Sequence, residues 1–174
     1  MARPAKAFVL WLTVLSGSGK TTLANRTYEY IEKRGLSVEK LDGDILRGLF
    51  PSTGFSRAQR DEHIKRVGFM ASILEKHGVI VVASFISPYR QARRFVRDMC
   101  SNFIEVYVQA PLDVCEKRDV KGLYTRARAG QIKNFTGLDD PYEEPQNLEL
   151  IINTDEQTVD ESVSVIIDFI GKYL

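Results

Sequence analysis

The chain has 174 residues, a length that suits one compact domain, 1–174, and leaves little room for a second. Lysine and arginine together number 24 and the acidic residues 23, so a net charge of +1 favours neither a general nucleic-acid binder nor a protein with an acidic tail. Because 44% of the residues are apolar and 10% are aromatic, the composition also excludes an intrinsically disordered chain.

Apolar runs alternate with amphipathic segments along the chain, a rhythm typical of a parallel sheet with helices on both faces. Buried parallel strands are continuous apolar runs. We predict strands, in chain order, at residues 8–14, 37–41, 79–86, 103–109 and 148–153. We predict helices at residues 20–34, 57–77, 89–101, 112–118 and 157–173. This alternation indicates an α/β domain with a mostly parallel central sheet of about five strands.

Charged residues are distributed unevenly along the sequence. Residues 57–97 contain nine lysines or arginines and three acids, whereas residues 139–174 contain ten acids and one lysine. The basic stretch suits a ligand that is rich in phosphate. The alternative is that its charges lie on solvated helix faces.

A glycine-rich turn lies between the first predicted strand and the first predicted helix. In a P-loop, such glycines let backbone N–H groups curl around phosphates at the N-terminus of a helix. Lys20 is then placed to bridge the β- and γ-phosphates, and the hydroxyl of Thr21 is placed for Mg²⁺. We therefore predict a P-loop NTPase-type three-layer sandwich that binds ATP through Ser16, Gly17, Ser18, Gly19, Lys20, Thr21 and Thr22.

One position departs from the usual P-loop pattern, because Val14 stands where the first glycine is expected. A β-branched residue is an outlier at positive φ, and even in an extended conformation its methyl groups crowd a place where backbone segments approach closely. Two outcomes are open: the valine only extends the strand, or it distorts the loop and impairs catalysis.

Several blocks downstream of the P-loop carry a more specific pattern. They are Asp42-Gly43-Asp44 with Arg47, Gly54-Phe55-Ser56 with Arg60, Phe85-Ile86-Ser87-Pro88-Tyr89-Arg90, Lys121-Gly122-Leu123-Tyr124, Phe135-Thr136-Gly137 and Asp140-Pro141-Tyr142-Glu143. By their order and spacing, the chain resembles the adenylylsulfate kinases from about residue 8 to residue 154. The resemblance implies transfer of the γ-phosphoryl group of ATP to the 3′-hydroxyl of adenosine 5′-phosphosulfate, which gives 3′-phosphoadenylyl sulfate and ADP.

Phosphoryl transfer depends on positioning and on neutralising charge, so the acceptor hydroxyl needs a nearby carboxylate. We assign that role to Asp44 and expect Asp42, which is closer to the strand, to orient water bound to Mg²⁺. The two roles are open to exchange, and a plain turn is the structural alternative for the pair. Lys20, Asp42 and Asp44 are the predicted catalytic residues, with Mg²⁺ held by Thr21 and Asp42.

The expected acceptor is an anionic adenine nucleotide. Arg47 and Arg60 suit its anionic group through forked hydrogen bonds. In the family two phenylalanines sandwich the adenine, and Phe55 and Phe135 match them here, although core packing is the alternative for Phe55. The other expected acceptor contacts are His63, Ile86, Ser87 and Lys121.

Three of these downstream positions leave the mechanism open. The resemblance implies that the serine at Ser87 is phosphorylated in some members, and the alternative is that it ends a strand and contacts substrate. His63 and Ile45 stand where the family usually has asparagine. An imidazole donates or accepts a hydrogen bond depending on its tautomer, so substrate affinity or specificity is expected to shift.

Residues 119–142 are rich in lysine and arginine and poor in apolar periodicity, so we predict a mobile lid rather than a buried element. Closing this lid would exclude water from the site. Arg126, Arg128 and Lys133 would then reach phosphates, with solvated loop charge as the alternative, and Arg128 is included in the predicted ATP site.

Together these observations favour an ATP-dependent adenylylsulfate kinase of sulfate assimilation with Mg²⁺ as cofactor, and the resemblance suggests a homodimer. The alternatives are a P-loop kinase of another small metabolite and a non-catalytic protein that binds sulfonucleotides or ATP. We expect no nucleic-acid or membrane partner, since no stretch approaches the ~20 apolar residues of a membrane span. Cys100 and Cys115 provide no disulfide framework, which favours the cytoplasm.

Overall fold

One parallel sheet organises the chain in the computed structural model, which describes residues 6–50 and 54–174. Its strands lie in the order β2-β3-β1-β4-β5, and every neighbouring pair is parallel. They are β1 (Val9–Thr13), β2 (Val38–Asp42), β3 (Ile80–Phe85), β4 (Phe103–Gln109) and β5 (Leu150–Asn153). The five-stranded parallel sheet confirms the predicted fold class.

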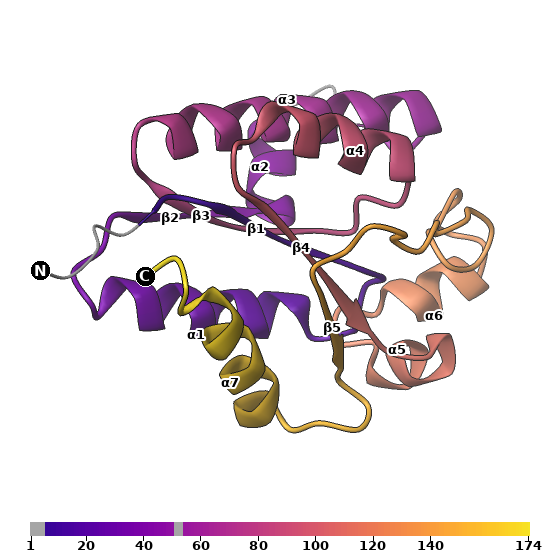
Figure 1. The fold of residues 1–174 in the computed structure, drawn as a ribbon. Helices are drawn as coiled ribbons and strands as arrows, with labels where there is room; N and C mark the ends of the chain where they lie inside the picture. The colour runs from indigo at the N-terminus through magenta and orange to yellow at the C-terminus, as the bar shows by residue number, and fades with distance from the viewer. Residues whose placement is uncertain (1–5, 51–53) are drawn as a thin grey trace, which may run out of the picture.

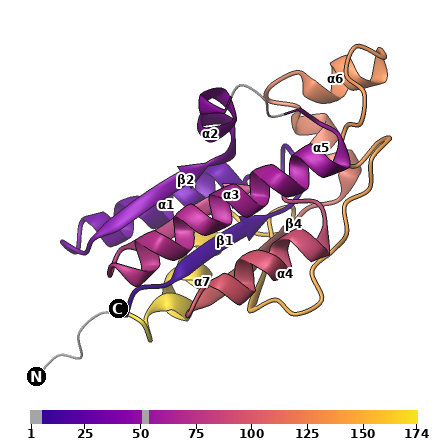
Figure 2. The ribbon, with the colours of Figure 1, turned by 90° about the horizontal axis from the view of Figure 1, so that it is seen from above.

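Helices cover both faces of this sheet (Figure 1). Helices α1 (Lys20–Glu32) and α7 (Val159–Ile170) lie on one face. The other face carries α2 (Gly43–Leu49), α3 (Arg57–Lys76) and α4 (Arg90–Met99), and Figure 2 shows α3 and α4 side by side over the sheet. Two short helices, α5 (Leu112–Arg118) and α6 (Leu123–Arg128), follow β4 beyond the end of the sheet.

The central strand β1 is buried on both sides. Successive side chains of a strand point to opposite faces, and those of Leu10 and Leu12 pack in the core formed with α1 and α7. Val9 and Trp11 pack in the second core, which is formed with α3 and α4. This double burial explains why the strand is a continuous apolar run in the sequence.

The predicted strands and long helices are all present, with ends that differ by at most three residues from the predicted ones. Helix α2 was not predicted, because Asp42-Gly43-Asp44 was interpreted only as the end of a strand, with a plain turn as the alternative. Asp42 both ends β2 and caps α2, where its Oδ1 accepts a hydrogen bond from the backbone N–H of Asp44 at 2.9 Å. Helix α6 was missed inside the predicted lid, which therefore contains regular structure.

The basic and acidic stretches of the sequence meet in space. We call residues 140–149, which connect the predicted lid to β5, the strap. Arg57 pairs with Glu143 at 3.6 Å, Arg60 with Asp140 at 3.9 Å and Arg97 with Glu149 at 2.6 Å. The sequence suggested either phosphate binding or solvated helix faces for these arginines, whereas the structure gives them partners within the chain.

Across the described residues, no helix combines the length and apolar character that crossing a bilayer requires. The same part of the chain contains both cysteines, and Cys100 and Cys115 are free thiols.

Candidate active site

The turn between β1 and α1 has the backbone shape that a P-loop requires. Gly17 and Gly19 have φ values of 80° and 98°, in the left-handed region that favours glycine. A Cβ atom at Gly17 would lie 2.7 Å from the backbone oxygen of Cys115, so no side chain fits there. Ser18 is fully buried, and its hydroxyl has no hydrogen-bond partner within the protein. The turn therefore supports the predicted nest of backbone N–H groups.

Val14, the residue that departs from the P-loop pattern, is a core residue. It follows β1 directly, is 1% exposed and packs in the core that includes α1 and α7. It is not among the non-glycine residues with positive φ, which in the described ranges are Ser87 and Asn134. The structure therefore favours the first of the two open outcomes, in which the valine extends the apolar strand without backbone strain.

Lys20 begins α1 and lies beneath the turn, where its Nζ donates a hydrogen bond to the backbone oxygen of Leu15 at 3.3 Å. The pKa of Lys20 is lowered to about 8, mainly by desolvation and to a smaller extent by the positive charge of Lys121. The negative charges of Asp44 and Asp42 raise this pKa and offset part of the shift. A phosphate group beside Lys20 would favour the charged ammonium again. The site is therefore electrostatically suited to an anion.

A cavity of about 240 Å³ joins the P-loop to the carboxyl ends of β2 and β3. In parallel α/β sheets this edge is where ligands bind. The lining brings together most of the residues predicted to bind the acceptor or catalyse transfer. They are Ser16, Lys20, Thr21, Asp42, Asp44, Arg47, Phe55, Arg60, His63, Ile86, Ser87, Lys121 and Phe135.

The two carboxylates of the cavity are placed by the start of α2. Asp42 is partly occupied as the helix cap, and Asp44 is exposed in the first turn of the helix. Lys121, from the predicted lid, forms an ion pair with Asp44 across the cavity mouth. The cavity therefore contains an exposed carboxylate that can act as a proton acceptor.

Arginines and phenylalanines form the outer part of the cavity. The guanidinium of Arg47 lies 4.8 Å from the centre of the Phe55 ring, and Phe55 is 51% exposed, so core packing does not explain it. Phe135 is buried, with its ring 4.9 Å from that of Tyr124. Arg60 is buried as well. Its donors reach the backbone oxygens of Phe55 and Asn134 and the hydroxyl of Thr136, so it connects α3 to the predicted lid.

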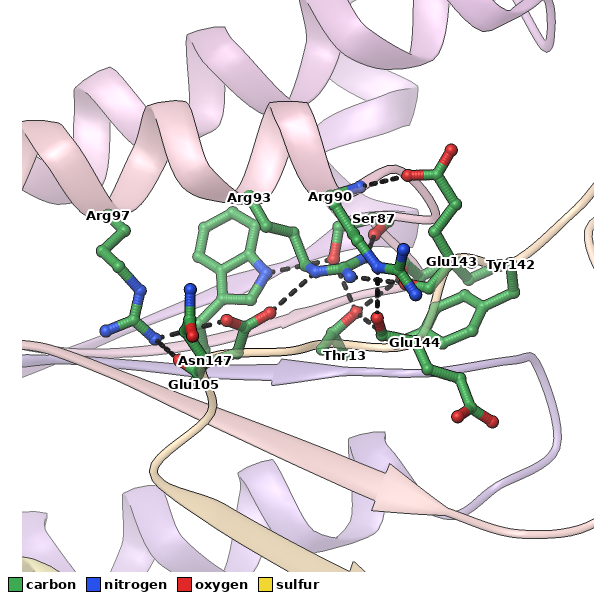
Figure 3. Close-up of polar contacts among 12 residues, drawn as sticks. Thr13, Ser87, Arg90, Arg93, Arg97, Glu105, Tyr142, Glu143, Glu144 and Asn147 are labelled. Carbon is green, nitrogen blue, oxygen red and sulfur yellow. Dashed lines mark hydrogen bonds and ion pairs between the residues drawn. The ribbon is translucent and has the colours of Figure 1, made fainter.

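Ser87 follows β3 in an unusual backbone conformation, with φ at 39°. Its side chain is buried, and the indole N–H of Trp11 donates to Ser87 Oγ at 3.1 Å. Thr13 Oγ1 lies 2.8 Å from Ser87 Oγ and 3.0 Å from the Tyr142 hydroxyl (Figure 3). Because Thr13 also donates to the backbone oxygen of Ile86, it accepts from both of these hydroxyls. The hydroxyl that a phosphoenzyme would need is thus already hydrogen-bonded inside the protein.

His63 lies on α3 with its ring edge-on to Phe50 and to Phe85. It is 2% exposed, and neither ring nitrogen has a hydrogen-bond partner within the protein. Burial, together with the positive charges of Arg47 and Arg66, lowers the pKa of His63 to about 4. A neutral imidazole with two unpaired nitrogens therefore faces the cavity and can both donate and accept.

Other residues predicted to contact ATP or phosphate lie outside this cavity. Gly17, Ser18, Gly19 and Thr22 belong to the P-loop and the first turn of α1. Arg128, in the last turn of α6, forms an ion pair with Glu116 of α5 at 2.8 Å. Its contact with ATP remains a prediction that requires the lid to move.

Sequence reasoning missed two residues that support the P-loop. Arg118, at the end of α5, donates to the backbone oxygen of Thr154 at 2.7 Å and approaches that of Ser18 at 3.4 Å. Tyr124 of α6 is buried and donates to the backbone oxygen of Ser16 at 2.9 Å. Tyr124 was visible only as part of the Lys-Gly-Leu-Tyr block, and nothing in the sequence distinguished Arg118 from other helix-ending arginines.

The first prediction concerns pH and His63. The unfolded chain binds the His63 proton near the ordinary histidine pKa of about 6.5, whereas the folded chain binds it only at about pH 4. The free energy of unfolding should therefore fall as the pH drops through this window, by roughly 1 to 2 kcal/mol between pH 7 and about pH 5. Urea unfolding of the unaltered chain and of His63→Asn at both pH values measures the difference. An identical pH dependence in the two proteins would contradict the assignment.

The second prediction concerns Val14. Replacing it with glycine should lower the free energy of unfolding by about 2 to 4 kcal/mol, because a buried side chain is lost and the unfolded chain gains freedom. Nucleotide affinity should stay within about threefold, since the phosphate-contacting residues are untouched. Urea unfolding and calorimetric titration with ATP measure the two quantities, with Val14→Ala as the control that keeps a non-glycine backbone. A gain in affinity above about tenfold would show instead that valine distorts the loop.

Comparison with known proteins finds relatives along nearly the whole chain. The family model described as Adenylylsulphate kinase matches residues 6–153. An adenylyl-sulfate kinase of Halothermothrix orenii is 51% identical over 171 residues, which cover 98% of this chain and 92% of that protein. One from Microcystis aeruginosa is 54% identical over 160 residues, covering 91% of this chain and 88% of that protein.

A solved structure agrees with these sequence relatives. The APS kinase of Mycobacterium tuberculosis in complex with AMPPNP and APS is 39% identical and superposes with a TM-score of 0.91, covering 97% of this chain and 99% of that one. The P-loop, the acceptor blocks and the sheet order thus occur together in a chain that belongs to the adenylylsulfate kinase family.

Proposed function

We propose that this chain transfers the γ-phosphoryl group of ATP to the 3′-hydroxyl of adenosine 5′-phosphosulfate, giving 3′-phosphoadenylyl sulfate and ADP. One observation carries the proposal. A single cavity contains the P-loop lysine Lys20, the carboxylates of Asp42 and Asp44, and the side chains of Phe55 and Phe135. Donor, acceptor and proton-accepting groups therefore meet in one place, which is what phosphoryl transfer requires.

The roles at the reacting centre follow from the placement of the charged groups. Lys20 neutralises charge on the transferring group, and its partly buried position strengthens that interaction. Asp44 accepts the proton of the acceptor hydroxyl, and its ion pair with Lys121 fixes where the carboxylate lies. Closure of residues 119–142 then excludes water, and Tyr124 already anchors this segment to the P-loop.

The acceptor is held by the outer part of the cavity. Phe55 and Phe135 stack on the adenine, and Arg47 binds the anionic phosphosulfate. Arg60 lines the same wall, and its hydrogen bonds to Phe55 and to the lid fix where the two phenylalanines stand. Ile86, Ser87 and His63 complete the surface that meets the acceptor.

Magnesium fits the donors at this site. Thr21 and Asp42, both on the cavity wall, offer a hydroxyl and a carboxylate, and Mg²⁺ prefers oxygen ligands with several positions left for water and substrate phosphates. Among the described residues no group of three or more His, Cys, Asp and Glu gathers to hold a metal without substrate. Bound Mg²⁺ supplies charge neutralisation at the β- and γ-phosphates.

We further propose a homodimer that serves sulfate assimilation in the cytoplasm. An outer face of α3 and α4 carries exposed apolar side chains, Phe69 at 58%, Ile73 at 41% and Phe95 at 43% exposure. Exposed apolar patches of this kind mark interaction surfaces. This face is the one we propose for contact with a second copy of the chain.

The third prediction is the direct test of the proposed reaction. ADP formation should require ATP, Mg²⁺ and adenosine 5′-phosphosulfate together, and a coupled ADP-release assay measures it. Lys20→Ala should lower kcat by about 10²- to 10³-fold, because a cation is lost from the reacting centre. Faster turnover with AMP, gluconate or shikimate would assign another acceptor. ATP binding without turnover on any acceptor would identify a non-catalytic nucleotide-binding protein.

The fourth prediction separates the two carboxylates. Asp44→Asn should lower kcat by about 10²- to 10⁴-fold with little change in acceptor KM, because a proton acceptor acts mainly in the transition state. Asp42→Asn should instead raise the Mg²⁺ concentration needed for half-maximal activity. Asparagine also caps helices well, so α2 remains capped in that variant. The reverse pattern in a Mg²⁺ titration would exchange the two roles.

A further inference from the structure

Arg93 is a buried arginine behind the cavity that contains Lys20 and Asp44. No part of the proposed reaction uses it. Arg93 lies on the inner face of α4, and its side chain is 2% exposed. Its Nε donates to Glu105 Oε1 on β4 at 2.7 Å, and the side chain of Glu105 is 6% exposed. A buried guanidinium is costly unless its donors are satisfied. The partners of its other two nitrogens therefore show what else holds this guanidinium in place.

Those partners are two backbone carbonyls from segments far apart in the sequence. Arg93 Nη1 donates to the backbone oxygen of Ser87 at 2.6 Å, and Nη2 donates to that of Glu143 at 2.5 Å. Figure 3 shows the guanidinium between the turn at Ser87 and the strap, with Tyr142 beside it. One planar, rigid group thus fixes the distance between the two segments.

The turn at Ser87 forms part of the cavity wall that we assign to the acceptor, and we call residues 86–88 the acceptor wall. Ile86, Ser87 and Pro88 line the cavity that also contains Lys20 and Asp44. The backbone of Ser87 has φ at 39°, a conformation that a non-glycine residue keeps only when its surroundings hold it. The hydrogen bond from Arg93 to the Ser87 carbonyl is one of those restraints.

The strap contacts the same turn through further hydrogen bonds. The N–H of Glu143 donates to the Pro88 backbone oxygen at 2.8 Å, and the N–H of Arg90 donates to Glu143 Oε2 at 2.8 Å. The Tyr89 hydroxyl donates to the Asp140 carboxylate at 2.9 Å. Because the strap overlaps the end of the predicted lid at residues 140–142, the acceptor wall and the end of the lid share one attachment.

We propose that Arg93 is a positioning residue for phosphoryl transfer: it clamps the acceptor wall at residues 86–88 to the strap at residues 140–144, and so sets the place of the acceptor relative to the P-loop. It touches neither substrate nor Mg²⁺ in this role. The proposal rests on the proposed function for its substrate and extends it to a residue that acts through Ser87 and Glu143.

A neighbouring arginine provides a matched control. Arg97 lies one turn further along α4 and contacts the other oxygen of the same carboxylate, Glu105 Oε2, at 3.3 Å. Its other partners are Glu149 and the backbone oxygen of Asn147, which lie further along the strap. Arg93→Lys and Arg97→Lys therefore make the same chemical change beside the same carboxylate, but only the first removes hydrogen bonds to the acceptor wall.

The fifth prediction is a split between the two substrates. Arg93→Lys should raise the KM for adenosine 5′-phosphosulfate at least about tenfold and leave the KM for MgATP within about twofold, because a small displacement of the acceptor wall weakens binding there alone. Arg97→Lys should leave both KM values within about twofold, even if it lowers the melting temperature. Equal changes in the two KM values, or equal effects of the two variants on the acceptor KM, would overturn the proposal.

Hydrogen exchange provides a readout that needs no substrate. In Arg93→Lys, amides of residues 86–90 and 140–144 should exchange faster together, whereas Arg97→Lys should affect residues 147–149. Unchanged exchange in both of the first two segments would overturn the clamp, and inactivity of the unaltered chain toward adenosine 5′-phosphosulfate would overturn the proposed function alone. If Arg93→Lys does not fold, Glu105→Gln, which removes the charge that holds the Arg93 guanidinium in place, should accelerate exchange in residues 140–144 and 86–88. Its failure to do so would count against the clamp.

Discussion

The complete burial of β1 is the constraint on which the site depends. Val9, Leu10, Trp11 and Leu12 are each 0% exposed, so the strand has no solvated face. The parallel register brings the neighbouring strands to that same end, with Thr13 opposite Phe85. The P-loop, the acceptor wall and the carboxylates after β2 are therefore side by side because they all leave one edge of the sheet.

Electrostatic pairing within the chain determines which cations remain for substrate. Arg60 and Arg93 are buried and bonded to the lid or the strap, and Arg97 is held by carboxylates. What remains on the cavity wall are a few placed cations, chiefly Lys20 and Arg47, rather than a broad basic surface. Such a site suits a small, defined anion better than a long polyanion. Acidic residues of the C-terminal stretch pair with several of the arginines. This pairing leaves fewer free positive charges that would attract polyanions without discrimination.

Elements with a strong local signal could be predicted from the sequence, and contacts between distant segments could not. The P-loop needs only a short glycine pattern, and the buried strands need only an apolar run, so both were found. Helix α2 was missed because Asp42 serves as strand end and helix cap at once. The hydrogen bonds from Arg60 to Asn134 and from Arg93 to Glu143 join segments separated by many residues. No periodicity records such contacts, because they depend on how the sheet orders its strands.

The position of Trp11 gives this protein a built-in optical reporter. It is the one tryptophan in the sequence, and its indole N–H is bonded to Ser87 Oγ, directly behind the acceptor wall. Indole emission depends on the polarity and hydrogen bonding around the ring, and the ring of Phe85 is stacked on it at 5.1 Å. Intrinsic fluorescence therefore reports on the surroundings of this one ring, and we expect both filling of the neighbouring cavity and loss of the fold to change it without an added label.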